Sequence, residues 1–255
     1  ISAVGSPAIA GAYALCANIA NKTLAGVAAL TSFALPHASG LTVRGDRAQM
    51  ASFLHALDRG VIVLVAPILL PGVLLSEPFL TLWLRENSTR ELVTVFRILW
   101  VAFALNAFSV PIGSILAAHG NTGLAARFAW LTVLIVIGSI LLLVPSWGAP
   151  GAAVAMLLGM ATSPVFNLVA RRTLALPAPE GRLRFWSGMA LGVAAQAIVL
   201  GLWHGSVSSW LLFVAAGTST VATFYVVRAI FGRLSPEEAR VLEALALRLR
   251  RNVLP

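Results

Sequence analysis

The sequence predicts an all-α polytopic integral membrane protein with about seven transmembrane helices. Its 255 residues are 59% hydrophobic and only 11% charged, and the mean hydropathy is +0.90. A soluble domain typically carries roughly 25% charged residues, so this chain lacks the polar side chains that a water-covered surface needs. Its apolar residues also occur in runs long enough to cross a bilayer core about 30 Å thick, which takes roughly 20 residues per helix.

A scan for such runs gives seven candidate spans and a polar tail. The spans lie at residues 7–35, 60–76, 92–118, 124–145, 150–170, 185–204 and 208–231. We therefore divide the chain into a seven-helix transmembrane bundle, 1–231, and an amphipathic basic tail, 232–255. Short turns at 145–151 and 204–209 predict that the helices on either side of each are antiparallel neighbours.

The second span is the least regular. It is short and contains Pro67 and Pro71, which predict a kink or a broken helix. Just before it, residues 46–59 place apolar side chains at helical spacing and charges elsewhere, which predicts a separate helix lying in the membrane interface. These apolar residues are Met50, Phe53, Leu54 and Leu57.

The tail predicts a terminal helix at the cytoplasmic surface. Ser235 is a suitable N-cap, Pro236 the first helical residue and Glu238 the capping-box partner. Basic residues close the helix, which suits both its dipole and an anionic inner leaflet. A solvated or interfacial helix is the simpler interpretation, and a partner-binding helix is the alternative.

The distribution of basic residues predicts the orientation in the membrane. If the seven spans alternate, 14 of the 18 basic residues fall on one side, and Arg85, Arg90 and Arg97 fall towards the other. The positive-inside rule then predicts that the C-terminus is cytoplasmic and that the first span starts on the outer side of the membrane. The chain begins with Ile1 and not with Met, so we expect a further segment to precede it.

Several functional classes are disfavoured by composition. All nine acidic residues lie outside the centres of the predicted spans, whereas proton relays and cation-coupling sites usually need intramembrane carboxylates. We find no Ser/His/Asp set or carboxylate pair for hydrolysis, so the chain is not expected to be an enzyme. Cys16 and four scattered histidines give no metal-ligand spacing, and no cofactor is expected. The sequence contains no aromatic-rich basic patch of the kind that binds nucleic acid, so a nucleic-acid partner is not expected.

Lys22 is the main candidate for a binding residue, because it lies near the middle of the first span. A charge at that depth costs about 2.5–3.5 kcal/mol, so it should face a cavity or a partner. Asn18 and Asn21 are its neighbours on the helix and complete one polar face. This face either lines a water-filled cavity and offers a positive charge to an anionic ligand, or Lys22 pairs with a carboxylate elsewhere or snorkels to the interface.

Two further residues are candidates for lining the same cavity. Arg97, one turn before Trp100, either anchors at the outer interface or faces the cavity mouth. Asn106 lies within the third span, where a hydrogen bond between helices is the alternative role.

Short motifs along the chain occur in a recognisable order. A "LTLWL" segment is followed by "LAAHG" at a turn and by a Pro/Gly/Ala-rich turn that opens the next helix. Together with the opening helix, this order resembles the polysaccharide-transporter branch of the multidrug/oligosaccharidyl-lipid/polysaccharide flippase superfamily. The matching positions are Leu80–Leu84, Leu116–Gly120, Pro145, Gly148, Gly151, Ala152 and Ala153, with Gly11, Tyr13, Ala14 and Pro36 in the opening helix.

The resemblance implies that the seven spans form the C-terminal half of a fourteen-helix flippase in the cytoplasmic (inner) membrane. Such a protein translocates an undecaprenyl-diphosphate-linked glycan for the synthesis of O-antigen, capsule or exopolysaccharide, and a polysaccharide polymerase is a candidate partner. Lys22 would then bind the diphosphate or an acidic sugar, with no covalent chemistry.

Three alternatives remain open. Two belong to the same superfamily: a multidrug-type antiporter and a peptidoglycan-precursor flippase. The third is an integral-membrane transferase acting on lipid-linked sugars, for which Glu77, Glu86 and Glu91 are the candidate acid or base residues.

Overall fold

The structure is a computed structural model that describes residues 7–32, 34–45, 47–85, 89–175, 182–203 and 206–231. These residues form ten α-helices and no strand, so the predicted all-α membrane fold is confirmed. The helices are α1 (Pro7–Thr31), α2 (Ala34–Arg44), α3 (Arg47–Leu74), α4 (Ser76–Leu84), α5 (Arg90–Ala107), α6 (Val110–Ala118), α7 (Thr122–Met160), α8 (Thr162–Thr173), α9 (Arg182–Leu202) and α10 (Trp210–Phe231).

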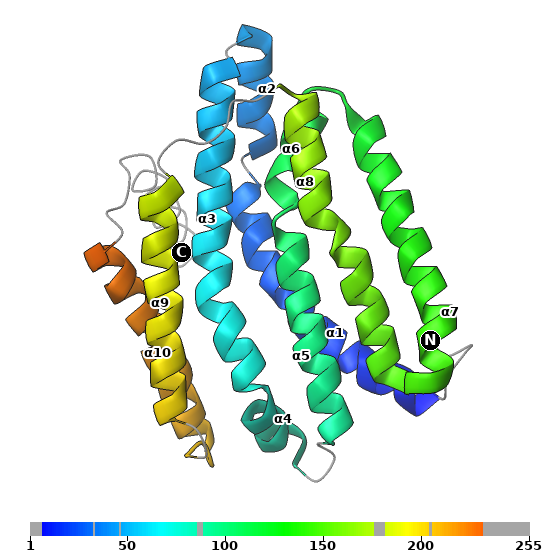
Figure 1. Cartoon of the computed structure of the whole chain (residues 1–255), viewed down its shortest axis with the longest axis vertical. Coiled ribbons are helices and arrows are strands. Elements are labelled where there is room, and N and C mark those ends of the chain that lie inside the picture. Colours follow the sequence, from blue (N-terminus) through cyan, green and yellow to red (C-terminus); the bar gives the residue numbers. More distant parts are fainter. Residues whose placement is uncertain are drawn as a thin grey trace, which may run out of the picture.

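Six helical segments of the described chain are long and apolar enough to cross a membrane, and one of them contains two of the predicted spans. That segment, Thr122–Thr173, has 52 residues, about 78 Å of helix, which is more than twice the bilayer core. At Gly148 the backbone leaves the helical region, with φ 60° and ψ −133°, and the chain turns back (Figure 1). Thr132 and Thr162 then meet across the hairpin at 2.7 Å. The predicted antiparallel pair of spans is confirmed.

The predicted separate interfacial helix at 46–59 is wrong. Residues 47–59 are the first half of α3, which continues without interruption to Leu74, and residue 46 lies outside the described residues. The buried Met50 and Leu54 belong to a core cluster with Leu41 of α2 and Ile112 of α6. The apolar stripe therefore packs against other helices and does not lie on lipid head groups.

Pro67 and Pro71 lie inside α3 without ending it. A proline has no N–H, so each one leaves the carbonyl four residues earlier without its helical partner. Here the Gln196 amide of α9 donates to the Pro67 carbonyl at 2.9 Å, and the Tyr225 hydroxyl of α10 donates to the Val63 carbonyl at 3.2 Å. The last two helices thus satisfy the backbone of α3, as an apolar environment requires.

The predicted third span is two helices, α5 and α6, joined near Phe108. Asn106, at the end of α5, accepts hydrogen bonds from Ser109 at 3.2 Å and from Ser163 of α8 at 3.4 Å. The Asn167 amide of α8 donates to the Phe108 carbonyl at 2.8 Å. Side chains of α8 therefore hold this junction. Asn106 takes part in a hydrogen bond between helices, which is the alternative role predicted for it.

The helices α9 and α10 form a second antiparallel pair. Gly192 faces the ring of the buried Phe224, and a Cβ atom there would lie 2.8 Å from that ring. Of the turn predicted at 204–209, the structure describes residues 206–209. The tail over 232–255, with Ser235, Pro236 and Glu238, lies outside the described residues.

Described members of the two predicted groups of basic residues lie at opposite ends of the bundle. The end of α2, the start of α3 and the end of α8 lie together at one end, while α4 and the start of α5 lie at the other (Figure 1). The first end carries Arg44, Arg47 and Arg171, and the second carries Arg85 and Arg90. We refer to the first as the basic end; that it faces the cytoplasm stays a prediction.

Candidate functional site

Lys22 lines a cavity of 440 Å³ between α1, α3, α4, α5 and α10. Among the described residues that line it, Lys22 is the one charged side chain, and nearly all the others are apolar or aromatic. The lining residues are Ile19, Lys22, Ile68, Pro71, Gly72, Leu75, Ser76, Phe79, Phe96, Trp100, Phe213, Gly217 and Val221.

Trp100 of α5 forms one wall of this cavity by lying directly on α3. Its indole Nε1 donates to the Ile68 carbonyl at 3.2 Å. A Cβ atom at Gly72 would lie only 2.0 Å from the indole ring, so no other residue type fits there without moving the tryptophan. The wall continues through Phe96, whose ring centroid is 5.3 Å from that of Trp100, to Phe79 at 5.8 Å. The cavity therefore combines one cation with an aromatic wall.

Lys22 and its two polar neighbours lie on the exposed face of α1. Asn18, Asn21 and Lys22 are exposed, whereas Cys16 and Ala20 are buried in the core. Lys22 is the member of this polar face that lines the cavity; Asn18 and Asn21 are not among the lining residues. Their predicted role in substrate binding stays a prediction.

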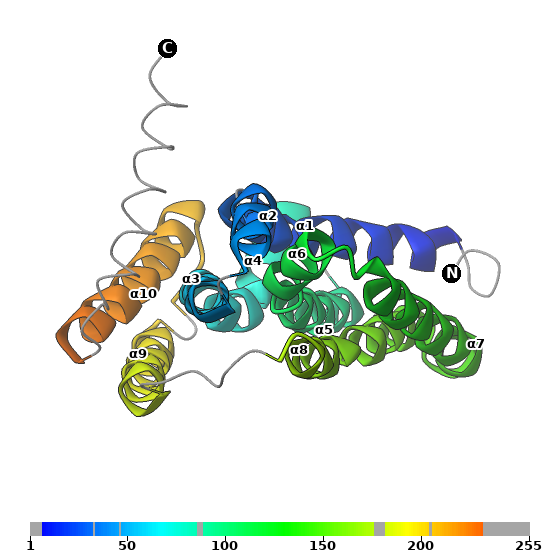
Figure 2. The same cartoon turned by 90° about the horizontal axis from the view of Figure 1, so that it is seen from above.

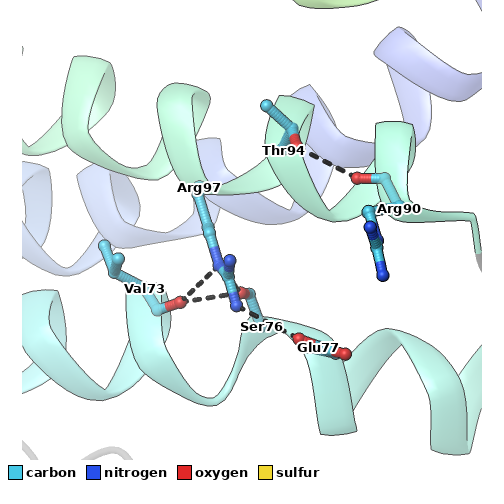
Figure 3. Close-up of polar contacts among 6 residues, drawn as sticks. All are labelled: Val73, Ser76, Glu77, Arg90, Thr94 and Arg97. Atoms are coloured by element: carbon cyan, nitrogen blue, oxygen red, sulfur yellow. Dashed lines mark hydrogen bonds and ion pairs between the residues drawn. The ribbon is translucent and has the colours of Figure 1, made fainter.

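Arg97 reaches from α5 to the junction of α3 and α4 (Figure 3). Its Nε donates to the Val73 carbonyl at 3.1 Å and to the Ser76 hydroxyl at 2.7 Å, and a terminal nitrogen lies 3.5 Å from the Glu77 carboxylate. The last carbonyls of a helix have no helical partner, so Arg97 completes the end of α3 and ties α4 to it.

The structure does not bring Arg97 or Asn106 to the Lys22 cavity. Arg97 lines a different cavity, of 800 Å³, together with Glu77 and with Trp203 near the end of α9. Asn106 lies at the α5–α6 junction described above. Of the five candidate residues, Lys22 alone is a lining residue of the first cavity.

Sequence reasoning missed a charged cluster on the first half of α3. Asp58 forms an ion pair with Arg171 of α8, whose Nε donates to Asn167 at 2.7 Å and whose terminal nitrogen lies 3.4 Å from His55 Nδ1. The prediction placed every carboxylate outside the centres of the spans and gave Asp58 no role, whereas Asp58 lies inside α3 and is only 18% exposed. The local signal was the pair of ionisable residues one turn apart, His55 and Asp58, amid apolar residues.

Comparison with known proteins does not assign this chain to a family. No protein-family model matches the chain, and no curated protein matches it significantly.

Proposed function

We propose that this protein translocates a lipid-linked oligosaccharide repeat unit across the cytoplasmic membrane, for the synthesis of O-antigen, capsule or exopolysaccharide. The observation that carries the proposal is the Lys22 cavity, in which one cation stands in an otherwise apolar wall within the membrane-spanning bundle. The order of the sequence motifs supports the same function.

The chemistry of the cargo matches that of the cavity. An undecaprenyl diphosphate carries negative charge between an apolar chain and a polar glycan. A lysine is a compact point charge that binds phosphate without fixed geometry, which suits a cargo that must be released. Asn18 and Asn21, exposed beside Lys22, offer amide donors and acceptors to sugar hydroxyls. Binding of the diphosphate also offsets the cost of placing the lysine at this depth.

The position of the cavity suits a transporter made of two bundles. In Figure 2, α1 and the start of α10 lie on one long side of the molecule, and α8 and α9 lie on the other. A second bundle opposite α1 and α10 would enclose Lys22 in a central cavity. Rocking of one bundle against the other would then open that cavity to each side of the membrane in turn.

The test replaces Lys22 with Ala and, separately, with Arg in the native gene, with surface polysaccharide as the readout. We expect Lys22→Ala to abolish the polymer at normal membrane abundance and Lys22→Arg to keep part of it. Arg90→Ala is the matched control, because Arg90 is an exposed cation that does not line the cavity. Normal polymer from Lys22→Ala would contradict the proposal.

The alternatives differ in the cargo or in the chemistry. Vesicles containing the purified protein and either an O-antigen-type or a peptidoglycan-type lipid-linked substrate would separate the two flippase functions. An antiporter needs a carboxylate that exchanges protons or cations, and Asp58 is engaged by Arg171. A transferase needs an acid or base in a substrate cavity. Glu77 contacts Arg97, and Glu91, exposed at the start of α5, lines neither the Lys22 cavity nor the Arg97 cavity; Glu86 lies outside the described residues.

A further inference from the structure

A second, smaller cavity lies between α3, α8 and α9, away from Lys22. Its volume is 190 Å³. The residues around it come from three distant parts of the chain and include two arginines, one aspartate and one histidine. The lining residues are His55, Asp58, Arg59, Ile62, Arg171, Phe185 and Trp186.

Guanidinium groups gather around this cavity from three helices. Arg171 of α8 is paired with Asp58. Arg59 of α3 lies with its Cζ 5.4 Å from the centroid of the Phe185 ring, and Arg228 of α10 lies 5.6 Å from the same centroid. Asp58 is the one carboxylate among the described lining residues. The cavity wall therefore carries two guanidinium groups, one of them paired with Asp58, and a third guanidinium group contacts the Phe185 ring of the wall.

The cavity lies beside the ends of α8 and α10 and the start of α9. Arg171 is in the last turn of α8, Phe185 and Trp186 are in the first turn or so of α9, and Arg228 is in the last turn of α10. Trp186 is 52% exposed, and tryptophan is enriched at the boundary between membrane and water. A cavity walled by charged groups beside an exposed tryptophan can accept a polar ligand.

We propose that this cavity binds the phosphate group of an anionic membrane lipid, with Arg59 and Arg171 as the principal ligands. The planar guanidinium group presents a fork of donors that matches phosphate oxygens, and basic pockets between helices at the basic end of membrane proteins suit such head groups. Ile62 and Phe185 supply an apolar side to the cavity. This site is separate from Lys22 and does not depend on the proposed transport function.

The test measures binding to the purified full chain in detergent. The probes are dioctanoyl phosphatidylglycerol, dioctanoyl phosphatidylcholine as the zwitterionic control, and inorganic phosphate, and the readouts are thermal stabilisation and native mass spectrometry. We expect saturable binding of phosphatidylglycerol, weakened about tenfold by Arg59→Gln because a charge-assisted contact is lost. Arg59→Lys, which keeps the charge but not the fork, should fall between the two.

Arg127→Gln is the matched control, because Arg127 is an exposed cation at the start of α7 that does not line the cavity. If inorganic phosphate also stabilises the protein and Arg59→Gln weakens that effect, the phosphate site is supported and free phosphate is a second ligand for it. Equal affinity of the unmodified protein and Arg59→Gln for phosphatidylglycerol would overturn the proposal, as would equal binding of phosphatidylcholine. Surface polysaccharide, the readout for Lys22, is not used here, so the two proposals fail independently.

Discussion

The two halves of α3 place different polar groups inside the bundle. The first half carries charged side chains, with Asp58 paired to Arg171 and Arg59 beside the ring of Phe185. The second half carries no charge but contains Pro67 and Pro71, so its polar groups are backbone carbonyls without helical partners.

Each half recruits a different neighbour to satisfy these groups. The charged half uses an arginine from α8, whereas the proline half uses an amide from α9 and a hydroxyl from α10. In an apolar environment every buried polar group must find a partner within the protein. The comparison teaches that both halves of α3 are held in place by polar contacts to other helices, and we expect these contacts to differ in strength. The predictions below test that difference.

The largest effect is expected from Gly72→Ala, in the proline half. The new Cβ would overlap the Trp100 indole at 2.0 Å, so the ring must move, at a cost of about 3 kcal/mol of unfolding free energy, the upper part of the overpacking range. Unfolding in mixed micelles would measure the loss. Gly26→Ala is the control, because its Cβ would meet Leu64 at an ordinary 3.6 Å. Equal stability of the two variants would show that Trp100 does not depend on a glycine.

Asp58→Asn tests the charged half. It leaves the half-buried Arg171 without its carboxylate, and we expect a loss of about 2 kcal/mol, below the value for a fully buried pair because both side chains are about one-fifth exposed. The double variant Asp58→Asn/Arg171→Gln removes both charges and should recover part of that loss. If the double variant loses more unfolding free energy than the two single variants lose together, the ion-pair explanation is contradicted.

Gln196→Leu tests the contact between α9 and the proline half. The side chain is fully buried, and its loss leaves the Pro67 carbonyl without a donor. We expect destabilisation of about 1–1.5 kcal/mol, near the upper end of measured hydrogen bonds between membrane helices. An unchanged unfolding free energy would mean that the hydrogen bond from Gln196 does not contribute to holding α3 in place.

The smallest effect is expected from Tyr225→Phe. It removes the 3.2 Å hydrogen bond to the Val63 carbonyl from a side chain that is 40% exposed. We expect a loss of about 0.6 kcal/mol, the average for such bonds. We expect the buried Gln196 contact to contribute more than the partly exposed Tyr225 contact. A larger loss of stability from Tyr225→Phe than from Gln196→Leu would contradict this order.

Hydropathy predicted the all-α membrane fold because each crossing needs its own apolar run, and that property is local. It could not place the start of α3, since a helix that continues beyond the bilayer and packs on other helices has the same apolar spacing as one lying at the interface. Met50 and Leu54 show this, because they belong to the core cluster with α2 and α6. The hairpin at Gly148 was predictable from its Pro/Gly-rich turn.

The candidate site was only partly predictable for a related reason. Lys22 stands out because a charge inside an apolar run is conspicuous in one stretch of sequence. The pairing of Asp58 with Arg171, and the contact of Trp100 with Gly72, join residues from different helices. Such pairs depend on how the helices pack, which the spacing of residues in one segment does not contain.

The attachment of α9 and α10 has a mechanical consequence. This pair contacts the rest of the described bundle mainly through α3, with a smaller contact of α10 to α4. The three cavities described above all have walls on both sides of that seam: α3 with α10 around Lys22, α3 with α9 at the basic end, and α3–α5 with the end of α9 near Arg97. A rigid displacement of the α9–α10 pair relative to α3 must therefore change all three volumes at once. A covalent cross-link between α3 and α9 that prevents such a displacement is therefore expected to fix all three cavity volumes together.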